Sequence, residues 1–388
     1  MSTSTPWQTF KAISPFFRPV LCCLGLTLVA TTVTLKLPAL AAETPKIRIL
    51  NQTPIASQST TPPRQPPDSM DRPAKRAWAI SWWGIPRAAT AGTEHLAALI
   101  SSRTGGRWTL KIHYGGALSA PDRNLDGLKA GRFQMAALCD FFHPRKTPAL
   151  SVLSLPFLPI ADRKTHRKIR EAVHAHPAVK AEFESFGAHL FMSTYLPPFE
   201  LVGRGAPPKD LEYWQGRAVR AGGGIGRAMT VLGAIPVNAT MPEIADGLRD
   251  GSIQVAALPV SYALSHRGIR NNASWYTSNL AAGSAECALA ISQAAYDKLP
   301  ANDKKLLQSL RPAVIAAQLE AYRQRRLDGP ADGNNGPRAI RFTDKQIATY
   351  RNTAGRPVIN AWIERHQRRF DAAGLVQTVF SAAGLKYE

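Results

Sequence analysis

Cysteine is scarce in this sequence, and the few cysteines present are not arranged as metal ligands. Two of the four, Cys22 and Cys23, lie in an apolar segment near the N-terminus, which leaves Cys139 and Cys287 for the rest of the chain. Two cysteines so far apart give no metal-ligand spacing. They could form a disulfide in an oxidising compartment, but each ends an apolar run, which favours two separate buried thiols. We expect no metal site.

Acidic residues are also few. The sequence has 27 aspartates and glutamates but 48 lysines and arginines, which gives a net charge of +21. Such an excess of positive charge raises nucleic acid or an anionic membrane surface as a partner. Here the basic residues form only short clusters on expected amphipathic helices, such as 163–168 and 323–326. No aromatic-interleaved basic motif accompanies them. We therefore expect a solvated basic surface and no nucleic-acid partner.

The residue sets that carry catalysis are absent as well. No Ser/His/Asp set, Cys/His set or pair of acidic residues occurs at a spacing that would indicate a catalytic site. The glycine-rich run at 222–226 lacks the Gly-Lys-Ser/Thr ending of a phosphate-binding loop. His174 and His176 are too short a constellation for a metal site, and we expect both to face solvent. The sequence therefore predicts neither an enzyme nor a cofactor.

The N-terminal part has the composition of a targeting segment followed by a linker. A positively charged start precedes an apolar run over 19–35, and an Ala-x-Ala site follows at 39–41. This is the anatomy of a secretory signal peptide over 1–41, with an uncleaved membrane anchor as the alternative. Residues 42–76 are rich in proline, serine, threonine and glutamine, which predicts a disordered linker. We expect export to the periplasm.

From residue 77 onward, strand-like runs alternate with helix-compatible segments. Apolar runs at 78–83, 108–114 and 135–138 are separated by helical spacing at 93–104 and 122–130. This β-α-β-α-β order predicts a parallel sheet with right-handed crossovers. The loops that follow the first and third strands would then leave the same edge of the sheet.

A second alternation of this kind spans 202–259. Three short apolar runs there end in glycine or proline, and helix-compatible segments separate them. Arg204 and Arg220 lie where such strands begin or end, which is where an open α/β sheet binds its ligand. A guanidinium is permanently charged and donates two parallel hydrogen bonds to a carboxylate. We therefore expect these arginines to hold an anion, with a structural ion pair as the alternative for each.

Eight short segments follow one another in an order that is found in a known family. They are TGGR at 104–107, GAL at 116–118, LDGLKAG at 125–131, LPFL at 155–158, LEYWQGRAVR at 211–220, LGAIPV at 232–237, MPE at 241–243 and YDKLP at 296–300. Each segment is weak alone, whereas their shared order and spacing are specific. From residue 77 to its C-terminus the chain resembles the substrate-binding subunit of tripartite ATP-independent periplasmic (TRAP) transporters, of the C4-dicarboxylate-binding (DctP) type.

The resemblance implies a two-lobed α/β periplasmic-binding-protein fold (type II-like), with a ligand cleft between the lobes. Lobe I would take 77–201 with 287–327 returning to it, and lobe II would take 202–286 with 328–388. The implied function is an extracytoplasmic solute-binding protein that delivers a small carboxylate to the membrane subunits of a TRAP transporter. The alternative is a receptor that presents a carboxylate to a membrane sensor.

The resemblance also implies site residues. In the family, the arginine of a Gly-x-Lys-x-Arg motif pairs with the substrate carboxylate, and this position matches Arg220. A second family arginine, upstream of that motif, matches Arg204. Glu243 matches a family glutamate, whose role is helix capping, lobe packing or binding. Where the family has an asparagine that helps to bind the ligand, this chain has Leu258.

Because leucine replaces that asparagine, we expect the pocket to be more apolar on this side. A C4-dicarboxylate would then fit less well than a monocarboxylate with an apolar or aromatic body, such as a keto acid. Five aromatic residues are candidates to line the pocket, namely Trp82, Trp83, Phe141, Phe142 and Tyr262. Ordinary core packing is the alternative for each of them.

Overall fold

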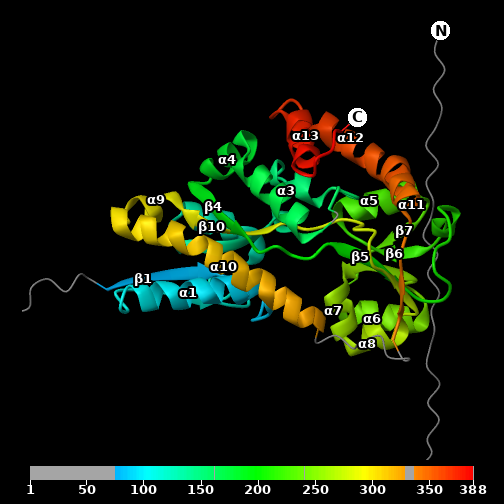
Figure 1. Ribbon diagram of the computed structural model, residues 1–388, viewed down its shortest axis with the longest axis horizontal. Helices are drawn as coiled ribbons and strands as arrows, with labels where there is room; N and C mark the ends of the chain where they lie inside the picture. The colour runs from blue at the N-terminus through cyan, green and yellow to red at the C-terminus, as the bar shows by residue number, and fades with distance from the viewer. Residues whose placement is uncertain (1–74, 161, 240, 328–335, 388) are drawn as a thin grey trace, which may run out of the picture. The chain divides into compact units, whose positions relative to one another are not determined.

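The protein contains two β-sheets, each covered by helices on both faces (Figure 1). The computed structural model describes residues 75–160, 162–239, 241–327 and 336–387. The signal peptide and nearly all of the linker expected before residue 77 lie outside these residues. The mixed α/β architecture confirms the expected fold class.

The first sheet has the strand order β2-β1-β3-β10-β4. Its strands are β1 (Arg76–Ser81), β2 (Trp108–His113), β3 (Met135–Cys139), β4 (Ala188–Ser193) and β10 (Cys287–Ser292). Strands β1, β2 and β3 are parallel, and α1 (Ala91–Arg103) and α2 (Asn124–Lys129) connect them. The expected β-α-β-α-β unit is thereby confirmed. Strand β10 is antiparallel to both β3 and β4.

The second sheet has the strand order β11-β9-β5-β8-β6-β7. Its strands are β5 (Phe199–Gly203), β6 (Ala218–Arg220), β7 (Ile235–Val237), β8 (Val255–Pro259), β9 (Trp275–Thr277) and β11 (Arg338–Ile340). Strands β6, β7 and β8 are parallel, with α5 (Gly223–Val231) and α6 (Met241–Asp250) as crossovers. Two short helices, α7 (Val260–Ser265) and α8 (Arg267–Asn272), follow β8. Because β6, β7 and β8 are parallel, their carboxyl ends lie at the same edge of the sheet.

Two segments cross between the sheets. Residues 194–198 connect β4 to β5, and residues 278–286 connect β9 back to β10. They lie side by side, because the backbone N–H of Phe199 donates to the carbonyl of Gly283 at 2.8 Å. These segments are the crossing strands that a two-lobed fold requires.

The helices of the first lobe lie on opposite faces of its sheet. Helix α1 and the long helix α10 (Ala301–Leu327), which is preceded by α9 (Gln293–Asp297), pack on one face. The other face packs against α2, α3 (Arg163–Ala175) and α4 (Pro177–Glu184). Short 3-10 turns occupy Ala88–Thr90, Pro121–Arg123, Asp140–Phe142, Leu150–Ser154 and Glu212–Trp214, and a π-helical turn spans Arg351–Gly355. Within the described ranges, no helix combines the length and the apolar character needed to cross a bilayer.

The C-terminal helices divide between the two lobes. Helix α11 (Asp344–Tyr350) packs in the core of the second sheet, whereas α13 (Ala372–Ala382) packs on α3 in the first lobe. Helix α12 (Arg356–His366) packs on α13 and α5, and its Ile359 and Trp362 join the first-lobe core. The sequence-based assignment placed all of 328–388 in the second lobe, so α12 and α13 differ from it. The physical reason is that Trp362 and Leu375, with their neighbours, complete the apolar core over α3.

Cys139 and Cys287 form a disulfide, so the expectation of two separate buried thiols is wrong. Each cysteine lies at one end of an apolar strand, and the two strands are antiparallel neighbours. Cys139 ends β3, Cys287 begins β10, and the two residues lie directly opposite each other in the strand register. Only the pairing of two strands that are 148 residues apart in the sequence brings the sulfur atoms together.

Candidate functional site

Arg220 lies at the carboxyl end of β6, the edge where the parallel strands of the second sheet end. Its Nε donates to the carbonyl of Ala239 at 3.1 Å, just beyond β7. Its Nη1 approaches the carbonyl of Ala257 in β8 at 3.4 Å. The two neighbouring strands therefore hold the guanidinium in place through backbone carbonyls, which carry no formal charge.

The charge of Arg220 has no acidic partner in the described part of the chain, where no ion pair involves it. The side chain is half-buried, and burial lowers the pKa of Arg220 from its usual value of 12.5. A guanidinium with such a high intrinsic pKa stays charged at neutral pH. Nη2 donates no hydrogen bond to any described residue. An anionic group arriving at this edge would therefore find a positioned, uncompensated cation.

The structure does not bring Arg204 together with Arg220. Arg204 follows β5, which is antiparallel to β8, so it lies beside the start of β8 rather than its end. Its Nη1 donates to the carbonyl of Arg249 at 3.3 Å. Arg204 thus faces the opposite edge of the sheet, and we leave it outside the candidate site.

The other two residues predicted on the second lobe by the family pattern have different positions. Glu243 lies exposed in the first turn of α6, which follows the loop that carries Ala239. Leu258 is buried, with 3% of its surface exposed, and packs with Ile244 and Leu248 of α6. Because side chains alternate along β8, Leu258 points into this core layer.

Aromatic side chains gather at the matching edge of the first sheet. Trp83 follows β1 and makes edge-to-face contacts with Phe141 and Phe142, which follow β3, at centroid distances of 6.5 and 5.7 Å. Phe141 is 50% exposed, unlike a core residue. Trp82, in contrast, is buried in the core beneath α1 and α10. On the second lobe, Tyr262 of α7 is 40% exposed. These are the aromatic groups that remain available for a ligand.

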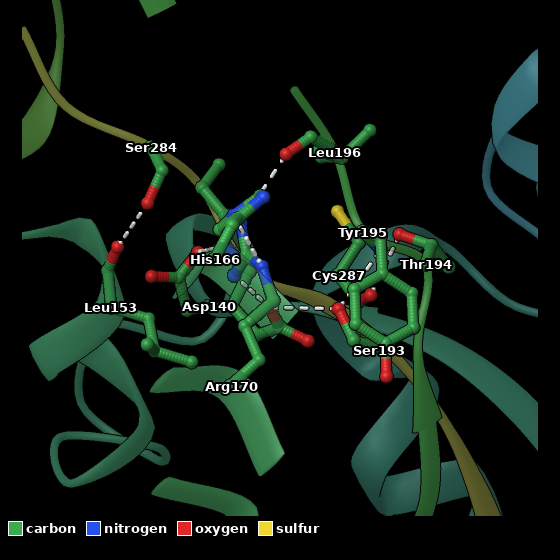
Figure 2. Close-up of polar contacts among 12 residues, drawn as sticks. Asp140, Leu153, His166, Arg170, Ser193, Thr194, Tyr195, Leu196, Ser284 and Cys287 are labelled. Carbon is green, nitrogen blue, oxygen red and sulfur yellow. Dashed lines mark hydrogen bonds and ion pairs between the residues drawn. The ribbon is translucent and has the colours of Figure 1, made fainter. Parts of the chain in front are cut away.

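A buried polar cluster ties the crossing segments to the first lobe (Figure 2). Arg170 of α3 forms an ion pair with Glu286, and both side chains are fully buried. Arg170 Nη2 donates to the carbonyl of Leu196 at 3.3 Å and to that of Ala285 at 3.1 Å. His174 contacts the other carboxylate oxygen of Glu286 at 3.1 Å. One arginine therefore holds both crossing segments.

Sequence reasoning missed this cluster and misplaced His174. That histidine was expected to face solvent, but its side chain is only 8% exposed. A signal was present in the sequence, because His166, Arg170 and His174 recur at intervals of four residues and so share one face of α3. That face also carries the buried Ile169 and Val173, which shows that the charged residues are internal.

The backbone of the crossing segments is itself strained. Tyr195 and Ala281, one on each segment, have φ angles of 51° and 47°. Residues with a Cβ rarely adopt this left-handed conformation, which persists where surrounding contacts enforce it. The enforcing contacts here include the bond from Ala281 N to Glu200 at 2.9 Å and that from Tyr195 N to Ser193 at 2.9 Å.

Asp140 adds a pH-dependent contribution to this region. Burial, together with the nearby Glu286 carboxylate, raises the pKa of Asp140 to about 7, although Ser154 and two backbone N–H groups donate to it. An acid whose pKa is raised on folding binds its proton more tightly in the folded state. Its stabilising contribution is complete below about pH 4 and is lost as the pH rises to about 7.

We therefore expect Asp140→Asn to change the pH dependence of unfolding in a defined direction. Between about pH 4 and pH 7, the wild-type free energy of unfolding should fall relative to the variant by up to about 1.4 kcal/mol per pH unit. Urea denaturation of both proteins at several pH values measures this difference. If the free energies of unfolding of the two proteins changed with pH in parallel over this range, Asp140 would not titrate as described.

A cavity of about 380 Å³ lies between α3 and α10. Its walls include Arg167 and Glu171 of α3 and Arg311 and Ile315 of α10. None of the residues predicted to bind ligand lines it. The candidate site therefore rests on the two sheet edges and not on this cavity. In the part of the chain that the structure describes, no cluster of side chains is suited to hold a metal ion.

Most of the chain matches a known family. Residues 87–362 fit the family model for bacterial extracellular solute-binding proteins of family 7, DctP. This match spans both sheets and the two crossing segments.

Solved structures with the same fold include several TRAP periplasmic solute-binding proteins. One from Desulfovibrio salexigens, in an open complex, has a TM-score of 0.68 and 19% identity, covering 80% of this chain and 96% of that one. One from Rhodoferax ferrireducens, in complex with copurified benzoate, has a TM-score of 0.63 and 18% identity, covering 79% and 97%. One from Ralstonia eutropha, with bound (S)-2-acetolactate, has a TM-score of 0.61 and 16% identity, covering 79% and 98%. With the family match, this shared two-lobed fold leads to one conclusion: the chain belongs to family 7 of the bacterial extracellular solute-binding proteins.

Proposed function

We propose that this protein is a periplasmic receptor that binds a small organic acid between its lobes and delivers it to a TRAP-type transporter. The observation that carries the proposal is the guanidinium of Arg220, which is half-buried, is held by the backbone carbonyls of Ala239 and Ala257, and forms no ion pair in the described residues. The family match supports solute binding as the activity. The carboxylates bound by the proteins from Rhodoferax ferrireducens and Ralstonia eutropha support the ligand class.

The geometry suits a carboxylate for a physical reason. The backbone carbonyls of Ala239 and Ala257 orient the guanidinium without neutralising it. A carboxylate can then accept hydrogen bonds from the remaining N–H groups in a bidentate arrangement. Exclusion of water as the lobes close strengthens this interaction, because the effective dielectric constant falls.

Ligand binding would shift the protein toward a closed form through the crossing segments at 194–198 and 278–286. Because these segments are short and fixed to the first lobe by Arg170, the second lobe is the part that would rotate. A ligand that contacts both lobes stabilises the closed form, since only that form lets it make both sets of contacts.

Replacing Arg220 by methionine tests the proposal. We expect the variant to lose about 2–5 kcal/mol of binding free energy relative to the wild type. The ligand is benzoate or another carboxylate that stabilises the wild type. The melting temperature without ligand should barely move, because no described acidic group loses a partner. Calorimetric titration and thermal denaturation with a panel of monocarboxylates and dicarboxylates measure both quantities.

Arg351 offers a matched control. Its guanidinium is also half-buried, its pKa is also lowered by burial, and its Nε also donates to a backbone carbonyl, that of Phe157, at 3.1 Å. It lies on the C-terminal helices, so Arg351→Met should leave carboxylate affinity unchanged. Native affinity in Arg220→Met, or an equal loss in both variants, would rule out the assigned role of Arg220.

A further inference from the structure

The cavity between α3 and α10 carries charges of both signs beside an apolar wall. Helix α3 contributes Arg167 and Glu171, and α10 contributes Arg311. Ile315 and Leu319, further along α10, supply the apolar wall. The volume of about 380 Å³ falls within the range of about 300–1,000 Å³ that is typical of small-molecule pockets. The cavity is therefore large enough for a small ligand of its own.

Arg311 gives this cavity a cation that is not neutralised within the described ranges. It forms no ion pair with any described residue. Its Nε is buried and has no hydrogen-bond partner among these residues. Buried N–H groups are nearly always hydrogen-bonded in native proteins. A ligand with a carboxylate would supply the missing acceptor and the missing negative charge together.

Hydrogen-bond acceptors are available beside the same cavity. Pro312 lies inside α10 and has no N–H, so it cannot donate to the carbonyl of Gln308, four residues before it. Both residues line the cavity. Glu171 pairs with Arg167 only at 3.7 Å, and the two side chains are 38% and 51% exposed. Such a pair is weak, so the carboxylate of Glu171 can accept further hydrogen bonds.

We propose that this cavity binds a zwitterion with an apolar side chain, namely an α-amino acid. The guanidinium of Arg311 pairs with the carboxylate of the ligand. The carboxylate of Glu171 and the backbone carbonyl of Gln308 accept hydrogen bonds from its ammonium group. Ile315 and Leu319 contact its side chain, which removes apolar surface from water.

Simple ions fit this cavity less well than a zwitterion does. An anion without an ammonium group would meet the carboxylate of Glu171. A cation without a carboxylate would meet the guanidinium groups of Arg167 and Arg311. Like charges in a partly enclosed site repel each other more strongly than in water. A zwitterion instead places each of its charges beside the opposite charge of the protein.

The cavity lies beside a crossing segment and belongs to one lobe. Tyr195, on the segment after β4, is within electrostatic range of Glu171 and Arg311. The same tyrosine shares a core cluster with Ile315. Both helices that wall the cavity pack on the first sheet, so binding there does not require closure of the lobes. This site is therefore distinct from the proposed carboxylate site at Arg220.

Calorimetric titration with two sets of related molecules tests the inference. The purified full chain carries Arg220→Met, so that carboxylates do not bind at the strand-end site. L-leucine is compared with 4-methylpentanoate, which lacks the ammonium group, and with 3-methylbutylamine, which lacks the carboxylate. L-phenylalanine is compared in the same way with 3-phenylpropanoate and 2-phenylethylamine. We expect the better amino acid to bind at least about tenfold more tightly than either counterpart, as one charge-assisted hydrogen bond implies.

Further substitutions in the same chain assign each part of the ligand to its partner. Arg311→Met should remove the preference for the amino acid over the amine, and Glu171→Gln should remove the preference over the acid. Pro312→Ala should weaken amino-acid binding by about threefold or more, because the restored N–H competes for the carbonyl of Gln308. Arg323→Met, on the same helix but outside the cavity, should leave the affinity unchanged.

Several results would overturn the inference. They are equal affinities for the amino acid and its two counterparts, unchanged preferences in Arg311→Met and Glu171→Gln, and no amino-acid binding at about 10 mM, where a millimolar site would be filled. Benzoate affinity in a chain that carries Arg311→Met alone should equal that of the wild type, because the two sites are separate. Loss of benzoate binding only in Arg220→Met would support the proposed function independently. Ligand-free melting temperatures verify the folding of each variant.

Discussion

Replacing Arg170 by methionine is expected to lower the free energy of unfolding by about 3–5 kcal/mol. The variant would leave the Glu286 carboxylate fully buried without its cationic partner. It would also remove the hydrogen bonds to the carbonyls of Leu196 and Ala285, one on each crossing segment. Urea denaturation of wild type and variant at constant pH measures the change.

A second substitution and a surface pair provide the controls. Adding Glu286→Gln to Arg170→Met should recover part of the lost stability, because the uncompensated buried charge is then gone. Arg323 pairs with Glu320 on α10, but both side chains are about half exposed, at 50% and 43%. Arg323→Met should therefore cost less than about 1 kcal/mol. Equal effects of the two arginine substitutions would contradict the structural role given to Arg170.

Loss of the disulfide is the other large expected effect. Replacing both Cys139 and Cys287 by alanine should lower the free energy of unfolding by about 2–5 kcal/mol. The bond closes a loop of 148 residues, so it restricts the unfolded chain over a long span. The two alanines would still fit the antiparallel register of β3 and β10, so the fold itself should persist.

Comparison with reductant isolates the contribution of this bond. Treatment with dithiothreitol should lower the melting temperature of the wild type toward that of the double variant, whose own melting temperature should not respond. The variant retains Cys22 and Cys23, so it also controls for any effect of those residues. A wild-type melting temperature that is insensitive to complete reduction would contradict a stabilising disulfide.

Both predictions concern the place where the lobes join. The disulfide links the end of β3 to the start of β10, and Glu286 immediately precedes Cys287. Arg170 holds both crossing segments a short distance away. Each crossing segment is thus fixed to the first lobe where it leaves that lobe. Movement between the lobes would then be confined to the part of each segment that lies between its contact with Arg170 and the second sheet.

The leucine at position 258, where the family has an asparagine, suggested an apolar monocarboxylate. In the structure Leu258 packs inside the second lobe, so it says little about the ligand surface.

Local pattern was enough to predict much of the architecture. Alternation of apolar runs with helical spacing predicted the parallel β1-β2-β3 unit, and the same pattern over 202–259 predicted β6, β7 and β8. Strand ends are visible in a sequence, and so Arg220 could be selected before any coordinates. The order of eight motifs was sufficient to indicate the family.

Tertiary structure alone decided which distant groups meet. Cys139 meets Cys287 and Arg170 meets Glu286 because strands far apart in the chain pair in one sheet, and no local spacing encodes that pairing. The same reason separates Arg204 from Arg220: both flank strands, but the antiparallel direction of β5 puts Arg204 at the opposite edge. A sequence determines that a residue ends a strand, whereas the direction and neighbours of that strand determine what the residue faces.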